Sequence, residues 1–314
     1  MLGSASILDW GVFLGVVLGT ILLDVAVFGR KTHRVSFREA SIRSVVWITV
    51  SLLFAGWIYH RLGAEKSVSY VVAYLVEKSL SVDNLFVFLV IFTYFRVKEE
   101  HQHRILFWGV FGAVVMRALF ILAGTALLQR FHFTMYLFGA FLVFTGLKLA
   151  FKKDDSVDPE SSLALRIARK YLRTTEKLEG DRFFVIRDGA RFATPLFLVL
   201  IVVEFTDVVF AVDSVPAVLA ISDDLFVVYT SNIFAIMGLR ALYFMLSGMM
   251  SRFHYLDIGL SVILVFIGVK MLGANWFKVP NFVSLGVIAG VLTLAVVVSL
   301  LKPAKHDEAP NSAS

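Results

Sequence analysis

The stretch EFTDVVFAVDSVPAVLA, residues 204–220, decides the fold, because it places three acids inside an apolar run long enough to cross a bilayer. The whole run covers residues 193–221, and about 20 apolar residues suffice to cross a hydrocarbon core of about 30 Å. Similar runs lie at residues 10–28, 45–60, 67–95, 105–128, 134–151, 226–250, 254–273 and 280–301. We therefore predict an all-α polytopic membrane protein with nine transmembrane helices.

The composition supports this class. Of the 314 residues, 58% are hydrophobic and 17% are charged, whereas soluble domains carry about 25% charged residues. The chain has no cysteine, which excludes disulfides, thiolate metal ligands and dithiol redox chemistry. Any metal ion must therefore be bound by oxygen or imidazole.

The basic residues predict the orientation. Of the 30 Lys and Arg, 21 lie in the connections on one side of the membrane and 4 in those on the other. By the positive-inside rule the N-terminus lies outside and the C-terminus in the cytoplasm. The net charge of +6 therefore reflects topology and gives no reason to expect nucleic-acid binding.

The longest connection, residues 152–192, is expected in the cytoplasm. Residues 162–172 mix apolar and basic side chains, as in a helix that lies on the inner leaflet. The dipeptide Asp188-Gly189 indicates a small hairpin. A solvated charged linker fits this segment equally well, and the polar tail is expected to be disordered.

An internal repeat organises the spans. Residues 142–148 (LVFTGLK) match residues 264–270 (LVFIGVK), and the tripeptide RFH occurs at 130–132 and 252–254, both at an offset of 122. Each unit holds three spans, so the second copy is inverted, as in many secondary transporters with a substrate site near the midplane. The predicted segments are a two-helix segment (1–66), repeat 1 (67–151), the loop (152–192), the inverted repeat 2 (193–273), the ninth span (274–301) and the tail (302–314).

The leading helices of the two repeats contain acids where lipid should exclude them. Ionisable groups within spans are costly and by default indicate a function. The candidate metal ligands are Glu77, Asp83, Glu204, Asp207 and Asp213. Supporting oxygens and bases come from Ser79, Ser81, Asn84, Thr206, Ser214, Lys78, Arg117 and Arg240.

An oxygen-only set of this kind suits hard divalent cations such as Mn²⁺, Mg²⁺ or Ca²⁺. Five acids and three bases leave a formal charge of −2, which matches one such ion, and protonation would release it. Structural ion pairing is the alternative, and for Arg117 and Arg240 it is the favoured role. Lys148 and Lys270 lie near span ends and are expected to extend to the interface.

Three motifs, residues 77–84 (EKSLSVDN), 204–217 (EFTDVVFAVDSVPA) and 231–242 (SNIFAIMGLRAL), resemble the TerC family and within it the Alx branch. The resemblance implies a protein of the bacterial inner membrane, historically named for tellurite resistance, that exports manganese or supplies metal to secreted enzymes. Carried over by position, the family's acidic motif falls on the same five acids.

Three function classes follow from these observations. The leading hypothesis is a manganese exporter with no permanently bound cofactor, whose partners are the lipid bilayer, Mn²⁺ and protons. An accessory protein that meets membrane or secretion partners through residues 152–192, or acts in tellurite resistance, is the second. Intramembrane aspartyl proteases also use two aspartates, but the Gly-x-Gly-Asp motif is absent, so we expect no enzyme.

Overall fold

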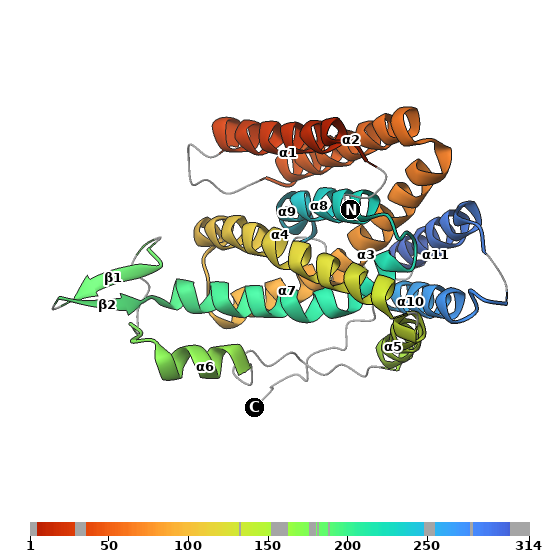
Figure 1. Cartoon of the computed structure of the whole chain (residues 1–314). Coiled ribbons are helices and arrows are strands. Elements are labelled where there is room, and N and C mark those ends of the chain that lie inside the picture. Colours follow the sequence, from red (N-terminus) through yellow and green to blue (C-terminus); the bar gives the residue numbers. More distant parts are fainter. Residues whose placement is uncertain are drawn as a thin grey trace.

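The computed structural model describes residues 5–28, 36–131, 133–151, 163–175, 180, 182–187, 189–247, 255–276 and 279–301. In this part of the chain eleven helices and one two-stranded sheet form (Figure 1). The elements are α1 (Ile7–Phe28), α2 (Phe37–Leu62), α3 (Ala64–Tyr94), α4 (Glu99–Arg130), α5 (Phe133–Ala150), α6 (Leu163–Tyr171), β1 (Phe184–Arg187), β2 (Ala190–Ala193), α7 (Pro195–Leu219), α8 (Leu225–Met237), α9 (Leu239–Leu246), α10 (Leu256–Leu272) and α11 (Asn281–Leu301).

The apolar helices agree with most of the predicted spans. Within the described residues, six segments are long and apolar enough to cross a membrane, and Ile7–Leu22 and Ile258–Leu272 are shorter apolar helices. These eight coincide with eight predicted spans. The remaining one, α3, forms a helix of 31 residues, whose apolar character is interrupted by the charged residues at its centre. The chain is therefore an all-α polytopic membrane protein with a small hairpin.

The outer surface of the bundle is apolar. Large side chains are exposed on the outer helices, for example Leu53 (70%), Phe144 (64%) and Leu294 (65%). In contrast, almost every side chain of α8 from Phe226 to Met237 is buried. An apolar exterior of this extent needs lipid around it, and α8 is the helix that the others enclose.

Aromatic side chains join α1, α2 and α8. The rings of Phe54 and Phe234 lie 4.9 Å apart, and Phe13 lies 6.0 Å from Phe54 and 5.8 Å from Phe234. Aromatic pairs at such distances add to the stabilisation from burial alone. This cluster fixes the first two helices against α8.

Glycines allow α5 and α10 to touch backbone to backbone. A Cβ atom at Gly146 would lie 2.9 Å from the carbonyl oxygen of Ser261, and one at Gly268 would lie 2.7 Å from that of Gly139. The Ser261 hydroxyl donates to the Gly146 carbonyl at 2.7 Å. Small residues permit this close helix approach in membranes, which explains why both repeated motifs contain glycine before their lysine.

The span predicted at 226–250 is not one continuous helix. It divides into α8 and α9 at Gly238, and residues 248–250 lie outside the described chain. In a continuous helix the amide of Leu239 would donate to the carbonyl of Ala235. Here that carbonyl accepts from Lys78 Nζ at 3.2 Å. A charged side chain from α3 therefore satisfies the backbone at the break, as an apolar environment requires.

The long connection contains the predicted helix and hairpin. β1 pairs antiparallel with β2, and Gly189 in the turn has a φ of +75°, which glycine adopts without strain. α6 packs beside α7 with Leu165 and Ala168 buried, so this apolar face contacts protein rather than the leaflet (Figure 1). Ile167 and Tyr171 of α6 are exposed, and contact of this helix with the leaflet stays a prediction.

Candidate functional site

A buried arginine connects four helices at the centre of the bundle. Arg117 of α4 has no exposed surface and forms ion pairs with Glu77 of α3 and Asp207 of α7, the latter at 3.3 Å from Nη2 to Oδ1. Its Nη1 also donates to Ser214 Oγ and to Asn232 Oδ1, each at 3.2 Å. We call these five residues the Arg117 cluster. Burial of charge is tolerated when each group is paired and hydrogen-bonded, which the cluster largely achieves.

Further contacts fix the Glu77 carboxylate. Asn232 Nδ2 donates to its Oε2 at 3.0 Å, and the Ser81 hydroxyl donates to its Oε1 at 3.3 Å. Two atoms of the cluster, Asp207 Oδ2 and Arg117 Nε, find no hydrogen-bond partner among the described residues. Structural ion pairing is therefore realised for Glu77 and Asp207.

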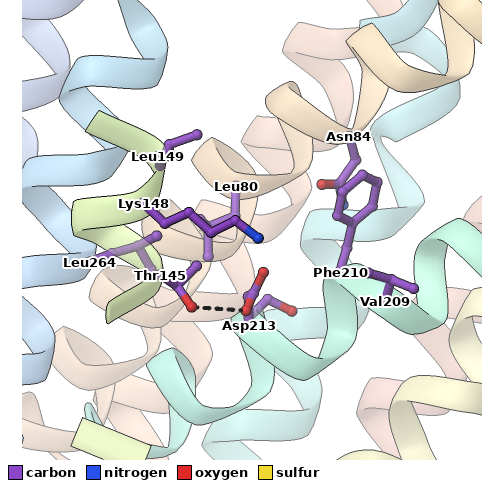
Figure 2. A pocket seen from close by; sticks show the side chains of 10 residues that line it. Leu80, Asn84, Thr145, Lys148, Leu149, Val209, Phe210, Asp213 and Leu264 are labelled. Atoms are coloured by element: carbon purple, nitrogen blue, oxygen red, sulfur yellow. Dashed lines mark hydrogen bonds between the residues drawn. The ribbon is translucent and has the colours of Figure 1, made fainter. Parts of the chain in front are cut away.

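A pocket that shares Ser214 with the Arg117 cluster contains Asp213. It has a volume of about 310 Å³, opens partly to the outside and lies between α3, α5, α7 and α10 (Figure 2). The Thr145 hydroxyl of α5 donates to Asp213 Oδ1 at 3.4 Å. Asn84, Ser214 and Lys148 also line the pocket, and its other walls are apolar. One carboxylate thus faces an accessible space beside amide and hydroxyl oxygens, which are the ligands that hard cations prefer.

Glu204 lies one helical turn before Asp207 on α7, close enough for their charges to interact. Its carboxylate fills the space beside Gly112 of α4, where an added Cβ atom would lie 2.1 Å from Oε1. No hydrogen bond or ion pair joins Glu204 to the described residues. The Glu204 side chain is half-buried and occupies the space that is free because Gly112 has no side chain.

The other predicted residues differ in what they contact. Ser79 and Thr206 donate to carbonyls of their own helices, Leu75 and Val202, at 2.6 and 2.7 Å. Such back-bonding is usual for hydroxyls in helices. Arg240 lines a narrow gap that Asp207 also lines. The side chain of Asp83 lies outside the described residues.

The four predicted ligands whose side chains the structure describes, Glu77, Glu204, Asp207 and Asp213, therefore do not form one coordination site. Among the described residues no group of three acidic or histidine side chains could bind a metal ion together. Arg117 pairs with Glu77 and Asp207, whereas Asp213, six residues after Asp207 on α7, lies about 120° away around the helix and faces the pocket. Sequence reasoning missed Asn232 as a member of the cluster, although an amide inside the apolar run 231–242 is a signal of its own.

That Lys270 extends to the interface stays a prediction, and its polar contacts lie in the first turn of α11. Its Nζ donates to Asn281 Oδ1 at 3.0 Å and to Ser284 Oγ at 2.9 Å, both on α11. Asn281 in turn donates to Ser69 of α3 at 2.7 Å. A desolvated ammonium is stable only with such acceptors, so α11 is joined to α10 and α3 through a polar network.

The fold and its polar interior define a class, that of multi-pass integral membrane proteins with ionisable groups inside the bundle. The sequence profile described as "Integral membrane protein TerC family" matches residues 62–307. The chain belongs to the TerC family.

Close relatives are bacterial. An uncharacterized membrane protein of Myxococcus xanthus is 44% identical over 305 residues, which cover 96% of both chains. A Salmonella typhi protein with the name "Putative membrane-bound redox modulator Alx" is 46% identical over 299 residues, covering 92% of this chain and 93% of its own. The protein of the same name from Escherichia coli K12 is 43% identical over 308 residues, covering 95% and 96%. No solved structure matches the chain.

Proposed function

We propose that this protein is a secondary transporter that exports Mn²⁺ from the cytoplasm across the bacterial inner membrane. The observation that carries the proposal is Asp213, a carboxylate inside an apolar helix that faces a partly open pocket lined by amide and hydroxyl oxygens. Such a site binds a hard divalent cation and has no soft ligand for a thiol-seeking one. The orientation follows the loop charges, with the N-terminus outside.

The pairing of helices supports the inverted repeat. If α3, α4 and α5 correspond to α7, α8 and α10, a two-fold axis exchanges the pair α4 and α7 with the pair α8 and α3. Both of these pairs are in extensive contact, and α5 packs against its own counterpart α10. The pocket touches α3 and α5 of one unit and α7 and α10 of the other. A site at the interface of two repeats is the expected position in alternating access.

The acids have separate roles in this account. Asp213 is the primary ligand, and Asn84, Thr145 and Ser214 offer neutral oxygens to the same ion. Glu77 and Asp207 are held by Arg117 and keep the helices in register. Glu204 and Asp83 supply further ligands or carry protons, so that proton binding accompanies release of the metal.

The name "redox modulator", which several relatives carry, agrees with the export of manganese. The chain contains no cysteine, so it cannot exchange disulfides itself. Export of a redox-active metal ion would change the redox state of the cell without any such chemistry in the transporter.

A specific observation favours an accessory role as the second candidate. The region after α5 contains an ordered helix and hairpin attached to the start of α7, where the Thr194 hydroxyl donates to the carbonyl of Arg182 at 2.6 Å. An ordered element outside the bundle offers a contact surface to a partner. If export depends on this region rather than on Asp213, the accessory function replaces the exporter.

The proposal is tested in a bacterium that lacks its own manganese exporters. Cells expressing the wild type, Asp213→Asn or Asp223→Asn at equal levels are loaded with manganese, and cell metals are measured by mass spectrometry. Asp223 is exposed in the connection after α7, so its variant is a matched control for loss of one carboxylate. Wild type and control should lower cell manganese selectively, and Asp213→Asn should not. If no metal changes with the wild type, the exporter function is wrong.

A further inference from the structure

We propose that Lys148 is a tethered cation that competes with the transported ion for Asp213 and thereby sets the affinity of the pocket. This inference rests on the proposed export function. Lys148 lies near the end of α5 and lines the same pocket as Asp213 (Figure 2). Its role is to position charge, since it contributes no ligand to a metal.

The geometry places the two charges in one space. The Lys148 ammonium points toward the Asp213 carboxylate, close enough for their charges to interact (Figure 2). Within the described part of the chain it nevertheless makes no hydrogen bond and no ion pair. Thr145, three residues earlier on the same face of α5, does contact Asp213 at 3.4 Å. α5 therefore presents a hydroxyl that holds the carboxylate and an ammonium that is available to approach it.

Comparison with the repeat counterpart shows that this freedom is particular to Lys148. Lys270 stands at the same position of the repeated motif, but its ammonium is bound to Asn281 and Ser284 of α11. α11 has no counterpart beside α5 among the predicted segments. The ninth helix thus immobilises one lysine of the pair and leaves the other at the pocket.

Lys148 lowers the affinity of the pocket for metal because it can balance the charge of Asp213 in an otherwise apolar wall. When the carboxyl group there is ionised, it needs a cation nearby. Lys148 can provide it when the pocket is empty, because a flexible four-carbon stem carries its ammonium. A divalent cation that enters must displace the ammonium, since two cations in one pocket repel each other. The apparent affinity for metal is then lower than the carboxylate alone would give.

The test measures Mn²⁺ binding to the purified full-length protein in lipid nanodiscs, from the electron paramagnetic resonance signal of free Mn²⁺. The variants are Lys148→Met, which keeps an unbranched stem but removes the charge, Lys148→Arg, which keeps the charge, and Asp213→Asn. Lys98→Met is the matched control, because Lys98 is 73% exposed in the connection between α3 and α4. Coupling between two ligands commonly changes affinity about 5- to 150-fold. We expect Lys148→Met to bind Mn²⁺ at least about fivefold more tightly, with Lys148→Arg and Lys98→Met close to wild type.

The outcomes separate this inference from the proposed function. If Asp213→Asn abolishes binding but Lys148→Met has the affinity of the wild type or a weaker one, the tethered cation is wrong and the exporter stands. If the wild type binds no Mn²⁺, the proposed function fails and this inference fails with it. If Lys148→Met is the one variant that binds Mn²⁺ more tightly, competition between Lys148 and the metal is supported. Loss of a merely structural lysine would not increase the affinity for Mn²⁺.

Discussion

Replacement of Arg117 by leucine tests the central packing of the bundle. The change leaves the carboxylates of Glu77 and Asp207 buried without their cation, and also removes a donor from Ser214 and Asn232. Breaking a buried ion pair by removal of one partner costs about 3–5 kcal/mol. We therefore expect Arg117→Leu to lose about 4 kcal/mol of unfolding free energy, a large part of the about 5–15 kcal/mol that folded proteins have.

The assay is thermal unfolding of the purified protein in detergent, followed by the fluorescence of its 5 tryptophans. At roughly 2–4 °C for each kcal/mol in a large domain, the midpoint should fall by about 10 °C. Arg130→Leu is the matched control, since Arg130 is exposed at the end of the same helix. It should unfold within about 2 °C of the wild type, because surface substitutions change stability by about 0.5 kcal/mol or less.

A compensating variant separates loss of charge balance from loss of volume. Arg117→Leu combined with Glu77→Gln and Asp207→Asn removes all three charges, so no carboxylate remains unpaired. It should recover at least half of the lost stability, because neutral amides cost less to bury than ions. The reasoning is refuted if Arg117→Leu unfolds like Arg130→Leu, or if the triple variant is no more stable than the single one.

Three further substitutions test contacts outside the cluster, each by the same unfolding assay. Gly146→Val should cost more than about 2 kcal/mol, because its Cβ would lie 2.9 Å from a backbone oxygen of α10; a wild-type midpoint would disprove the close approach. Asp224→Ala should lower the free energy of unfolding by about 1–2 kcal/mol, because it removes both the N-cap of α8 and the 2.9 Å ion pair with Lys66. If Lys66→Met lowers it by as much, the ion pair and not the cap is the main cause. Tyr243→Phe should cost about 1–3 kcal/mol, because the buried Gln102 Oε1 loses its 3.0 Å donor; unchanged stability would show that water replaces the hydroxyl.

The class of fold could be predicted from the sequence because lipid imposes a strong pattern. A run of about 20 apolar residues has few other uses, and eight of the predicted spans appear as apolar helices. The break at Gly238 could not be predicted, because it depends on Lys78, 160 positions away, which supplies a donor to the carbonyl of Ala235. Hydropathy does not encode such a long-range contact.

The candidate site could be predicted only as a set of residues. The cost of charge in lipid indicates that the acids on α3 and α7 have partners, but it does not indicate which partner each acid has. Arg117 pairs with Glu77 and Asp207, while Asp213 faces a pocket with Lys148. That division depends on how four helices are rotated about their axes. Lys270 shows the same limit, because the residues that bind it lie on another helix, α11.

The most direct test of the account is Mn²⁺ flux through purified protein in proteoliposomes that contain a manganese-sensitive dye. The comparison is again between the wild type, Asp213→Asn and the exposed control Asp223→Asn. The account predicts Mn²⁺ flux with the wild type and the control. With Asp213→Asn the flux should fall at least about 100-fold, because the amide keeps the shape of the side chain but lacks its charge. Each factor of ten in rate corresponds to about 1.4 kcal/mol. Equal flux in all three proteins, or no flux above empty vesicles with the wild type, would contradict it.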